Sequence, residues 1–422
     1  MKVFKFGGAS VNSIERIQNV ASILRSFSSE KILIVISAIG KTTNALEKVA
    51  EAFFEGEKEK ALELFTAIKN EHLETAKQLL QQNVQRANDR LLDIFTEVEW
   101  LLHDRPVREF DYYYDQIVCT GELLSTAIIS LYLNDQQISN TWIDVRDIFR
   151  TDNNFRDANI DWAFTEQQVN EQVLPLFDET NFVITQGFIG ATADNESTTL
   201  GREGSDYTAA IFANMLNAES QTIWKDVEGV MNADPKLFPA AQLINELNYK
   251  EVIEMAYYGA QVIHPKTIKP LQNKNIPLLV KCFLNKDLPG TIIHNSKVNN
   301  LPPIIVIKTN QVLLQLNSKD YSFVGEHAVG KLYQLLEAQN MRPNLTQNAA
   351  ISFVCCVDNK PEKIEKIAAA ASEMFDVQLQ KDLTLLTVRH YNNGILDELI
   401  ADKKLLIKQQ TVDTVQALVA AI

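Results

Sequence analysis

Short apolar runs alternate with segments of helical periodicity over the first 295 residues of the chain. Residues 31–38 hold a continuous apolar run, which is typical of a strand covered on both faces. Residues 14–27 space their apolar positions as an amphipathic helix does. Further runs that we interpret as strands are residues 2–6, 141–148, 181–190, 220–225 and 276–283. The pattern predicts an α/β fold with a mostly parallel sheet that helices cover on both faces.

A long helical region interrupts this alternation. Residues 45–105 are almost free of glycine and proline and carry helical spacing, so we expect a helical insertion over about 45–115. Residues 115–133 continue as a helix that is apolar nearly all round, and Glu122 falls inside it. A glutamate there either caps or snorkels harmlessly or serves a function, and the pattern leaves both readings open.

The order of elements changes after residues 299–303, which contain two prolines and read as a linker. Strands are predicted at 311–316, 350–357, 376–380 and 383–389, and helices at 329–338 and 360–374. This β-α-β-β-α-β type of order indicates a small α+β sandwich of the ferredoxin-like class. We therefore expect one domain over 1–298 and a second over 304–422.

Composition narrows the function classes. A chain of 422 residues has room for two or three domains, and its net charge of −14 argues against a general nucleic-acid binder. The four cysteines have no C-x-x-C spacing and only six histidines accompany them, which argues against a Cys/His zinc site. No apolar run reaches membrane-spanning length by this inspection, and no signal-peptide pattern precedes Lys5, so we expect a soluble cytoplasmic protein.

The turn after the first strand is suited to an anion. Gly7 and Gly8 break the strand, and Ser10 is placed to cap the helix that begins near Ile14. A strand, a glycine turn and a helix start aim backbone N–H groups at one point, where Lys5 adds a positive charge. Alone this signal is weak, because a glycine pair after a strand usually only makes a turn.

Two further turns follow predicted strands. Gly40-Lys41-Thr42 looks like the end of a P-loop, but Val35 stands where that motif needs its first glycine, so we read a polar turn instead. In residues 198–213, glycines bracket Arg202, and Ser205 or Asp206 is expected to cap the next helix. Ligands of open α/β sheets bind at such carboxyl ends of strands.

Six stretches together resemble the aspartate kinase family, in the order expected from residue 1 to about 295. They are K-F-G-G-A-S, V-I-S-A…T-T-N, G-E-L-L-S-T, T-L-G-R-E-G-S-D-Y-T-A-A, K-D-V-E-G-V-M-N-A-D-P and Y-G-A-Q-V-I-H-P. The resemblance implies an amino-acid-kinase fold with C-terminal ACT modules that bind amino-acid effectors and form a homodimer. The first module would cover 310–380 and a shortened second one 381–422.

The implied reaction transfers the γ-phosphoryl group of ATP to the side-chain carboxylate of L-aspartate, the first step of lysine, threonine and methionine biosynthesis. A carboxylate of pKa about 3.9 is already ionised, so positioning and charge neutralisation carry catalysis without a general base. By resemblance Lys5 stabilises the transferring phosphoryl group and Asp206 orients Lys5. Mg²⁺ would be held mainly by the ATP phosphates, and the sequence shows no dedicated ligand cluster.

The resemblance also assigns binding residues. Arg202 would grip the α-carboxylate of aspartate and Glu122 its ammonium group. The remaining substrate contacts would be Ser37, Thr43, Phe188 and Ser205, and the ATP contacts would be Lys5, Gly7, Gly8, Ser10, Lys225, Asp226, Met231, Lys236 and Gln261.

Several positions depart from the family pattern, mostly on the ATP side. Ala9, Lys225, Met231, Lys236 and Gln261 stand for threonine, threonine, tyrosine, arginine and lysine, and Glu203 replaces a glycine beside Arg202. Our hypothesis is that Lys225 or Lys236 supplies the cation for ATP that the uncharged Gln261 does not provide.

Two other functions remain alternatives: a kinase for another amino acid such as glutamate, and an amino-acid sensor without turnover. Glu122, Arg202 and the ACT-like tail favour aspartate, and a sensor would need damage at Lys5, Arg202 or Asp206, which the sequence does not show. Residues 324–330 and 345–350 lack the features of lysine-inhibited relatives, so we expect weak or absent lysine inhibition.

Overall fold

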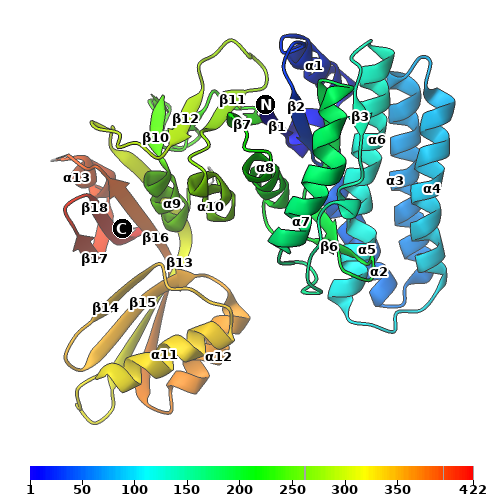
Figure 1. Cartoon of the computed structure of the whole chain (residues 1–422). Helices are drawn as coiled ribbons and strands as arrows, with labels where there is room; N and C mark the ends of the chain where they lie inside the picture. Colours follow the sequence, from blue (N-terminus) through cyan, green and yellow to red (C-terminus); the bar gives the residue numbers. More distant parts are fainter. Residues whose placement is uncertain (261–262, 393, 422) are drawn as a thin grey trace. The chain divides into compact units, whose positions relative to one another are not determined.

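The computed structural model describes residues 1–260, 263–392 and 394–421, which form two compact units (Figure 1). The first unit comprises residues 1–230, 243–253 and 263–298, and the second comprises the remaining described residues. Two short segments, 231–242 and 254–260, therefore cluster with the second unit although they precede the linker at 299–303. Each unit is described separately below.

An eight-stranded sheet forms the centre of the first unit, in the order β10-β12-β11-β7-β1-β2-β4-β3. Its strands are β1 Lys2–Phe6, β2 Ile32–Ile36, β3 Thr141–Trp142, β4 Phe182–Gln186, β7 Ser220–Lys225, β10 Glu246–Asn248, β11 Leu278–Cys282 and β12 Thr291–His294. All neighbours are parallel except β11 and β12. Every residue of β2 and β4 is buried, and because side chains alternate between faces, both faces of the sheet are covered. The predicted doubly covered parallel sheet is confirmed.

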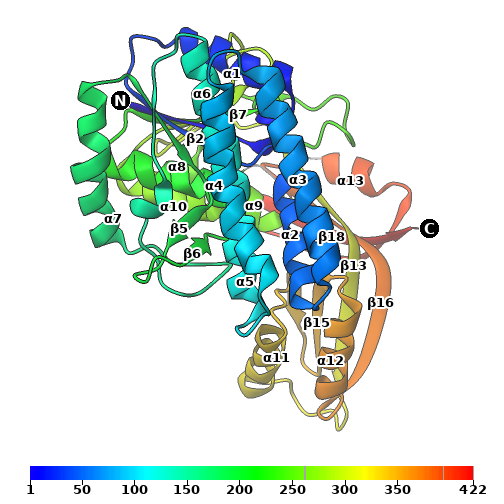
Figure 2. The same ribbon diagram turned by 90° about the vertical axis from the view of Figure 1, so that its right-hand side faces the viewer.

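The helices of this unit are α1 Ile14–Arg25, α2 Thr42–Phe54, α3 Lys58–Leu79, α4 Val84–His103, α5 Phe110–Val118, α6 Thr120–Asp135, α7 Trp162–Gln168, α8 Gly204–Met215 and α10 Pro265–Asn273. Figure 2 shows α3 and α4 side by side, where Lys69 donates to Glu99 over 2.9 Å. Short strands β5 Ile189–Ala191 and β6 Ser197–Thr199 pair with each other, and α9 Tyr249–Tyr258, β8 Val230–Met231 and β9 Leu243–Ile244 complete the elements before the linker.

The expectation that no apolar run reaches membrane-spanning length is wrong. The stretch Phe110–Asp135, which contains α5 and α6, is long and apolar enough to cross a membrane by length and composition alone, with a mean hydropathy of 1.4. However, 94% of its apolar window is buried inside the fold, as is common for a core helix. The stretch is explained by packing against the sheet.

Both predicted helix caps are corrected by the structure. Ser13, not Ser10, caps α1 by accepting the Arg16 amide, because a 3₁₀ turn over Gly8–Val11 takes up Ser10. The Ser10 hydroxyl instead donates to the Trp224 carbonyl. Glu203 occupies the N-cap of α8, which places Ser205 and Asp206 inside the first turn rather than before it.

The second unit holds a six-stranded sheet in the order β14-β15-β13-β16-β18-β17. Its elements from β13 to β16 follow the expected β-α-β-β-α-β order. Its elements are β13 Ile304–Ser318, α11 Glu326–Ala338, β14 Leu345–Asn348, β15 Ser352–Asp358, α12 Pro361–Ala371, β16 Phe375–Arg389, α13 Ile395–Ile400, β17 Lys403–Gln410 and β18 Thr414–Ala421. The two strands predicted at 376–380 and 383–389 are one continuous strand, β16.

Long strands let two modules share one sheet in the second unit. The second half of β13 pairs with β15, whereas its first residues, from Ile304 to Lys308, pair only with the end of β16. The same end of β16 pairs with β18, which pairs with β17. The C-terminal module is therefore a four-stranded layer whose outer strand comes from the start of β13 and whose own helix is the short α13.

Candidate active site

Side chains from distant parts of the first unit meet in a pocket of about 410 Å³. The pocket lies where β1 and β2 end and where α8 begins, the edge at which parallel sheets bind ligands. Its lining residues are Lys5, Gly8, Ser37, Ala38, Gly40, Thr43, Tyr114, Glu122, Arg156, Phe188, Thr199, Gly201, Arg202, Glu203, Gly204, Ser205 and Asp206. All six residues proposed to bind aspartate are thus in one pocket with Lys5 and Asp206.

Lys5 and Asp206 form an ion pair at the centre of this pocket. The Lys5 ammonium lies 2.6 Å from Oδ1 of Asp206, and both side chains are almost buried. Burial opposes ionisation of Asp206, but the charges of Lys5 and Lys225 outweigh it and lower the pKa of the carboxyl group. The first turn of α8 further favours a negative charge at this place. Asp206 therefore stays ionised and fixes the direction of the Lys5 side chain.

The glycine turn after β1 packs against the backbone of the turn after β2. A Cβ atom on Gly8 would lie 2.9 Å from the carbonyl oxygens of Ala38 and Gly40, closer than real Cβ atoms approach. The Gly40 amide donates to the Gly8 carbonyl over 3.2 Å. The polar turn at Gly40, which is not a P-loop, thus supports the glycine turn after β1, and only glycine fits at Gly8.

Glu122 is a buried carboxylate without a full set of partners. It is 2% exposed, so it does not snorkel, and its Oε1 accepts the Ala38 amide over 3.3 Å. Its Oε2 has no hydrogen-bond partner among the residues that the structure describes. Burial raises the pKa of Glu122 to about 8, against smaller lowering effects of backbone donors and Lys5. A buried acidic group with a free oxygen in a pocket is suited to a cationic ligand.

Arg202 projects from a turn whose shape depends on its neighbours. Gly201 has a φ of 76°, and a Cβ atom there would lie 2.6 Å from the Asp157 carboxylate. On the other side Glu203 is left-handed with a φ of 55°, and its carboxylate accepts the His264 amide over 2.9 Å. This bond explains how glutamate is tolerated where the family has glycine. Arg202 itself is exposed and lines the pocket, where its planar guanidinium is suited to a carboxylate.

Of the proposed ATP contacts, Lys5 and Gly8 line this pocket. Lys225 ends β7, one residue after Trp224, which pairs with Phe6 of β1, and Asp226 follows it. Neither of these residues lines the pocket, nor do Gly7 and Ser10. Met231 and Lys236 lie in the segment 231–242 of the second unit, and Gln261 lies outside the described residues.

Tyr114, Arg156 and Thr199 are among the pocket residues that sequence reasoning did not assign to the site. Behind them lies Asp115, which is fully buried and bonded to the backbone of both Arg156 and Thr199. Its only sequence signal is a charged residue at the start of the apolar segment 115–133. Within the described part of the chain, no group of three or more His, Cys, Asp or Glu residues is arranged to hold a metal ion.

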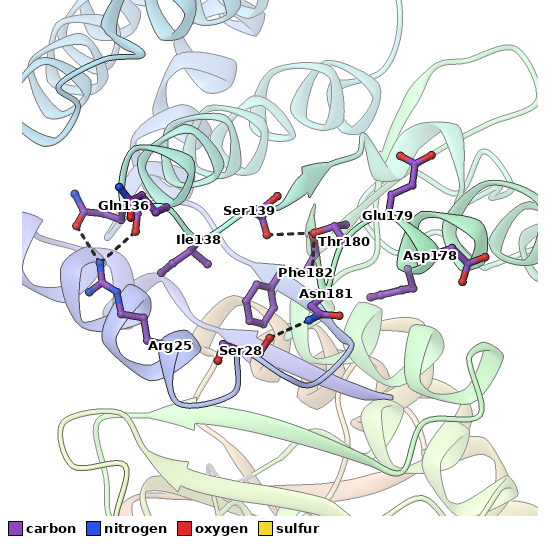
Figure 3. Close-up of a pocket in the computed structure, with 12 residues that line it drawn as sticks. Arg25, Ser28, Gln136, Ile138, Ser139, Asp178, Glu179, Thr180, Asn181 and Phe182 are labelled. Carbon is purple, nitrogen blue, oxygen red and sulfur yellow. Dashed lines mark hydrogen bonds between the residues drawn. The ribbon is translucent and has the colours of Figure 1, made fainter.

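A second cavity of about 520 Å³ lies where β2 and β4 begin, at the opposite edge of the sheet (Figure 3). Its polar groups bond to one another: Arg25 donates to Gln136 over 3.1 Å, and Asn181 donates to the Ser28 carbonyl over 2.9 Å. Figure 3 shows the Arg25 side chain turned toward Gln136 and the Asn181 side chain turned toward Ser28. Because these polar groups already bond to one another, they serve to hold the fold together. The pocket around Lys5 is therefore the better candidate for a ligand-binding site.

Comparisons with known proteins agree with this geometry. The model of the amino acid kinase family matches residues 1–282. Lysine-sensitive aspartokinase 3 of Escherichia coli strain K12 is 34% identical over 360 residues, which are 84% of this chain and 78% of that protein. The crystal structure of E. coli aspartokinase III with aspartate and ADP, described as its R-state, has a TM-score of 0.81 at 29% identity and covers 100% of this chain and 96% of its own.

A crystal structure of the same E. coli enzyme with lysine and aspartate, described as its T-state, has a TM-score of 0.80 at 28% identity, with the same coverage. The family match covers more than half of the chain, and the curated relative is matched over most of its length. These matches agree with a pocket in which Lys5, Glu122 and Arg202 lie together, and they establish the family. The chain belongs to the aspartokinases of the amino acid kinase family.

Proposed function

We propose that the pocket binds L-aspartate between Glu122 and Arg202 and presents its side-chain carboxylate to Lys5. An aspartokinase transfers the γ-phosphoryl group of ATP to that carboxylate and forms 4-phospho-L-aspartate. The observation that carries the proposal is the set of charges in one pocket: a buried carboxylate with a free oxygen, an exposed guanidinium and a buried ammonium. These charges complement the ammonium and the two carboxylates of aspartate.

The chemistry requires positioning rather than proton transfer. The aspartate carboxylate is ionised at neutral pH and attacks the γ-phosphorus directly, so no residue has to act as a base. Lys5 neutralises charge on the transferring group, while Asp206 holds Lys5 in place through their ion pair. Backbone N–H groups of the turn at Gly7 and Gly8 bind phosphate oxygens. Mg²⁺ enters as part of the MgATP substrate.

On the nucleotide side we propose that Lys225 supplies a phosphate-contacting cation. Lys225 lies at the carboxyl end of β7, directly beside β1, and its charge contributes to the lowered pKa of Asp206. Asp226 would lie along the nucleotide, and Lys236 remains the alternative source of the cation.

We propose that the second unit is an ACT region that binds an amino-acid effector and forms a homodimer of a cytoplasmic enzyme of lysine, threonine and methionine biosynthesis. The E. coli relative crystallised with lysine and aspartate in its T-state supports the proposal that an amino-acid effector binds to this enzyme. Residues 324–330 and 345–350 lack the features of lysine-inhibited relatives, so we expect less than twofold inhibition by millimolar lysine. Strong inhibition in a steady-state assay would contradict this expectation, and light scattering of the full chain tests the dimer.

Trapping of the acyl phosphate with hydroxylamine tests the reaction itself. With MgATP and L-aspartate we expect ATP-dependent formation of aspartyl hydroxamate, and with L-glutamate a rate at least tenfold lower. A glutamate rate equal to the aspartate rate would favour the broader amino-acid kinase. Failure with both substrates, in a protein that still binds aspartate, would favour a sensor without turnover.

A further inference from the structure

Asp115 is a buried carboxylate that lies behind the wall of the aspartate pocket. It belongs to α5 and is 0% exposed. Its Oδ2 accepts the amides of Thr199 and Arg156 over 2.8 and 3.0 Å, and its Oδ1 accepts the Thr199 hydroxyl over 2.7 Å. One side chain of the helical insertion therefore joins two segments that are 41 and 84 residues away in the chain.

The three donors belong to segments that form the pocket. Thr199 ends β6 and stands three residues before Arg202, and Arg156 lies in the loop beside it. Both residues line the pocket. The two segments are also bonded to each other, since the Ala158 amide donates to the Thr199 carbonyl over 3.0 Å. Movement of Thr199 would therefore shift both the loop and the turn that carries Arg202.

The turn is held on its other side by α10. The Lys266 ammonium donates to the Leu200 carbonyl over 3.2 Å and forms an ion pair with Asp157. Asp157 in turn packs closely against Gly201, since its Oδ1 lies 2.6 Å from the place that a Cβ atom there would take. Asp115 and Lys266 thus hold the residues before Arg202 from two sides.

We propose that Asp115 is a positioning residue of the aspartate pocket, which sets the place of Arg202 by fixing Thr199 and the Arg156 loop. The inference rests on the proposed function, in which Arg202 holds the α-carboxylate of aspartate. A carboxylate is suited to this task because it accepts only, and three donors converge on it. Burial raises the pKa of Asp115 to about 6 in spite of these donors, so the group is ionised at pH 7 and accepts all three bonds.

Substitution at Asp115 and at a matched carboxylate tests the proposal. Asp135 on α6 also accepts three hydrogen bonds, from the Gln81 and Gln82 amides and the Asn83 side chain, but it does not line the pocket. For Asp115→Leu we expect the KM for aspartate to rise about tenfold, with kcat and the KM for ATP changed less than about threefold. Asp135→Leu should lower the melting temperature and leave the KM for aspartate within about twofold.

Two milder variants cover the case in which Asp115→Leu does not fold. Asp115→Asn keeps one acceptor oxygen for the amides and should restore most of the affinity for aspartate. Thr199→Val removes only the hydroxyl bond and should raise the KM for aspartate about threefold. Both keep the size of the side chain that they replace, so the packing around it is preserved.

The outcomes separate this inference from the proposed function. Absence of aspartyl hydroxamate with the wild-type protein would overturn the proposed function. An active wild type together with an unchanged KM for aspartate in Asp115→Leu and in Thr199→Val would overturn only the positioning role. Equal increases of KM for aspartate and ATP, or the same increase in Asp135→Leu, would also overturn it, since both would indicate general damage to the fold.

Discussion

We predict that aspartate binding depends on pH and releases a proton, because burial raises the pKa of Glu122. Its pKa of about 8 means that the ligand-free protein holds it mostly protonated at pH 7. The ammonium group of aspartate needs the ionised carboxylate, so binding at pH 7 has to include deprotonation. One pKa unit is about 1.4 kcal/mol, which makes the apparent affinity at pH 7 about tenfold lower than at high pH.

Isothermal titration calorimetry measures both effects. Titrations of aspartate without nucleotide should give a Kd that falls about tenfold between pH 7 and pH 8.5 and then stays level. At pH 7, buffers of different ionisation enthalpy should report release of about 0.9 proton per aspartate bound. Glu122→Gln should bind more weakly, release no proton and show a level profile between pH 7 and pH 9, which makes it the control.

The same group predicts the direction of a stability change. Because the folded protein raises the pKa of Glu122 from 4.5 to about 8, the protonated form is favoured on folding. The associated stability is complete below pH 4.5 and is lost as the pH rises toward 8, by up to roughly 5 kcal/mol. Glu122→Gln should therefore melt above the ligand-free wild type at pH 8.5, but not at pH 5. A level binding profile and no proton release in the wild type would refute this reasoning about Glu122.

Three further substitutions test the other parts of the site in steady-state assays. Arg202→Lys should raise the KM for aspartate about 10- to 100-fold, because it removes the planar fork that binds a carboxylate through two bonds, and an unchanged KM would argue against the assignment. Lys225→Met should raise the KM for ATP more than that for aspartate, whereas unaltered ATP kinetics would leave Lys236→Met as the variant to measure. Gly8→Ala should lower kcat at least about tenfold, since its Cβ atom would lie 2.9 Å from two carbonyl oxygens, and a fully active variant would show that the turn can shift.

The parts of the fold that sequence reasoning predicted are those with strong local signals. The continuous apolar run at β2 is typical of a covered strand and forms one, and the glycines beside Arg202 mark a turn. Predictions that rested on a few residues were altered by neighbouring turns. Residues 141–148 form a strand only over Thr141–Trp142, because Asp144 then caps a 3₁₀ turn by accepting the Arg146 amide. The cap of α1 was misplaced for the same reason, since a 3₁₀ turn before the helix takes up Ser10.

Long-range pairing was not predictable from local pattern. Asp115 gives no recognisable spacing, because its partners Arg156 and Thr199 are brought to it only by the folded chain. Similarly, the C-terminal module was expected to be incomplete because its residues after 381 are too few. The structure adds a strand from the start of β13, which precedes the first module in the sequence. Sequence patterns locate elements well, but such sharing depends on tertiary contacts.

Several residues around the pocket have a strained backbone, and hydrogen bonds hold each of them in place. Three non-glycine residues that line it, Arg156, Phe188 and Glu203, have φ values of 68°, 72° and 55°. Each left-handed residue costs about 1–2 kcal/mol, and each is held by a bond: from the Arg156 amide to Asp115, from the Phe188 amide to Thr208 and from the His264 amide to Glu203. A reaction whose nucleophile is already ionised gains little from acid–base groups, so its rate depends on how well two charged substrates are aligned. The three partly buried hydrogen bonds hold the strained residues in place, which favours alignment of the two substrates.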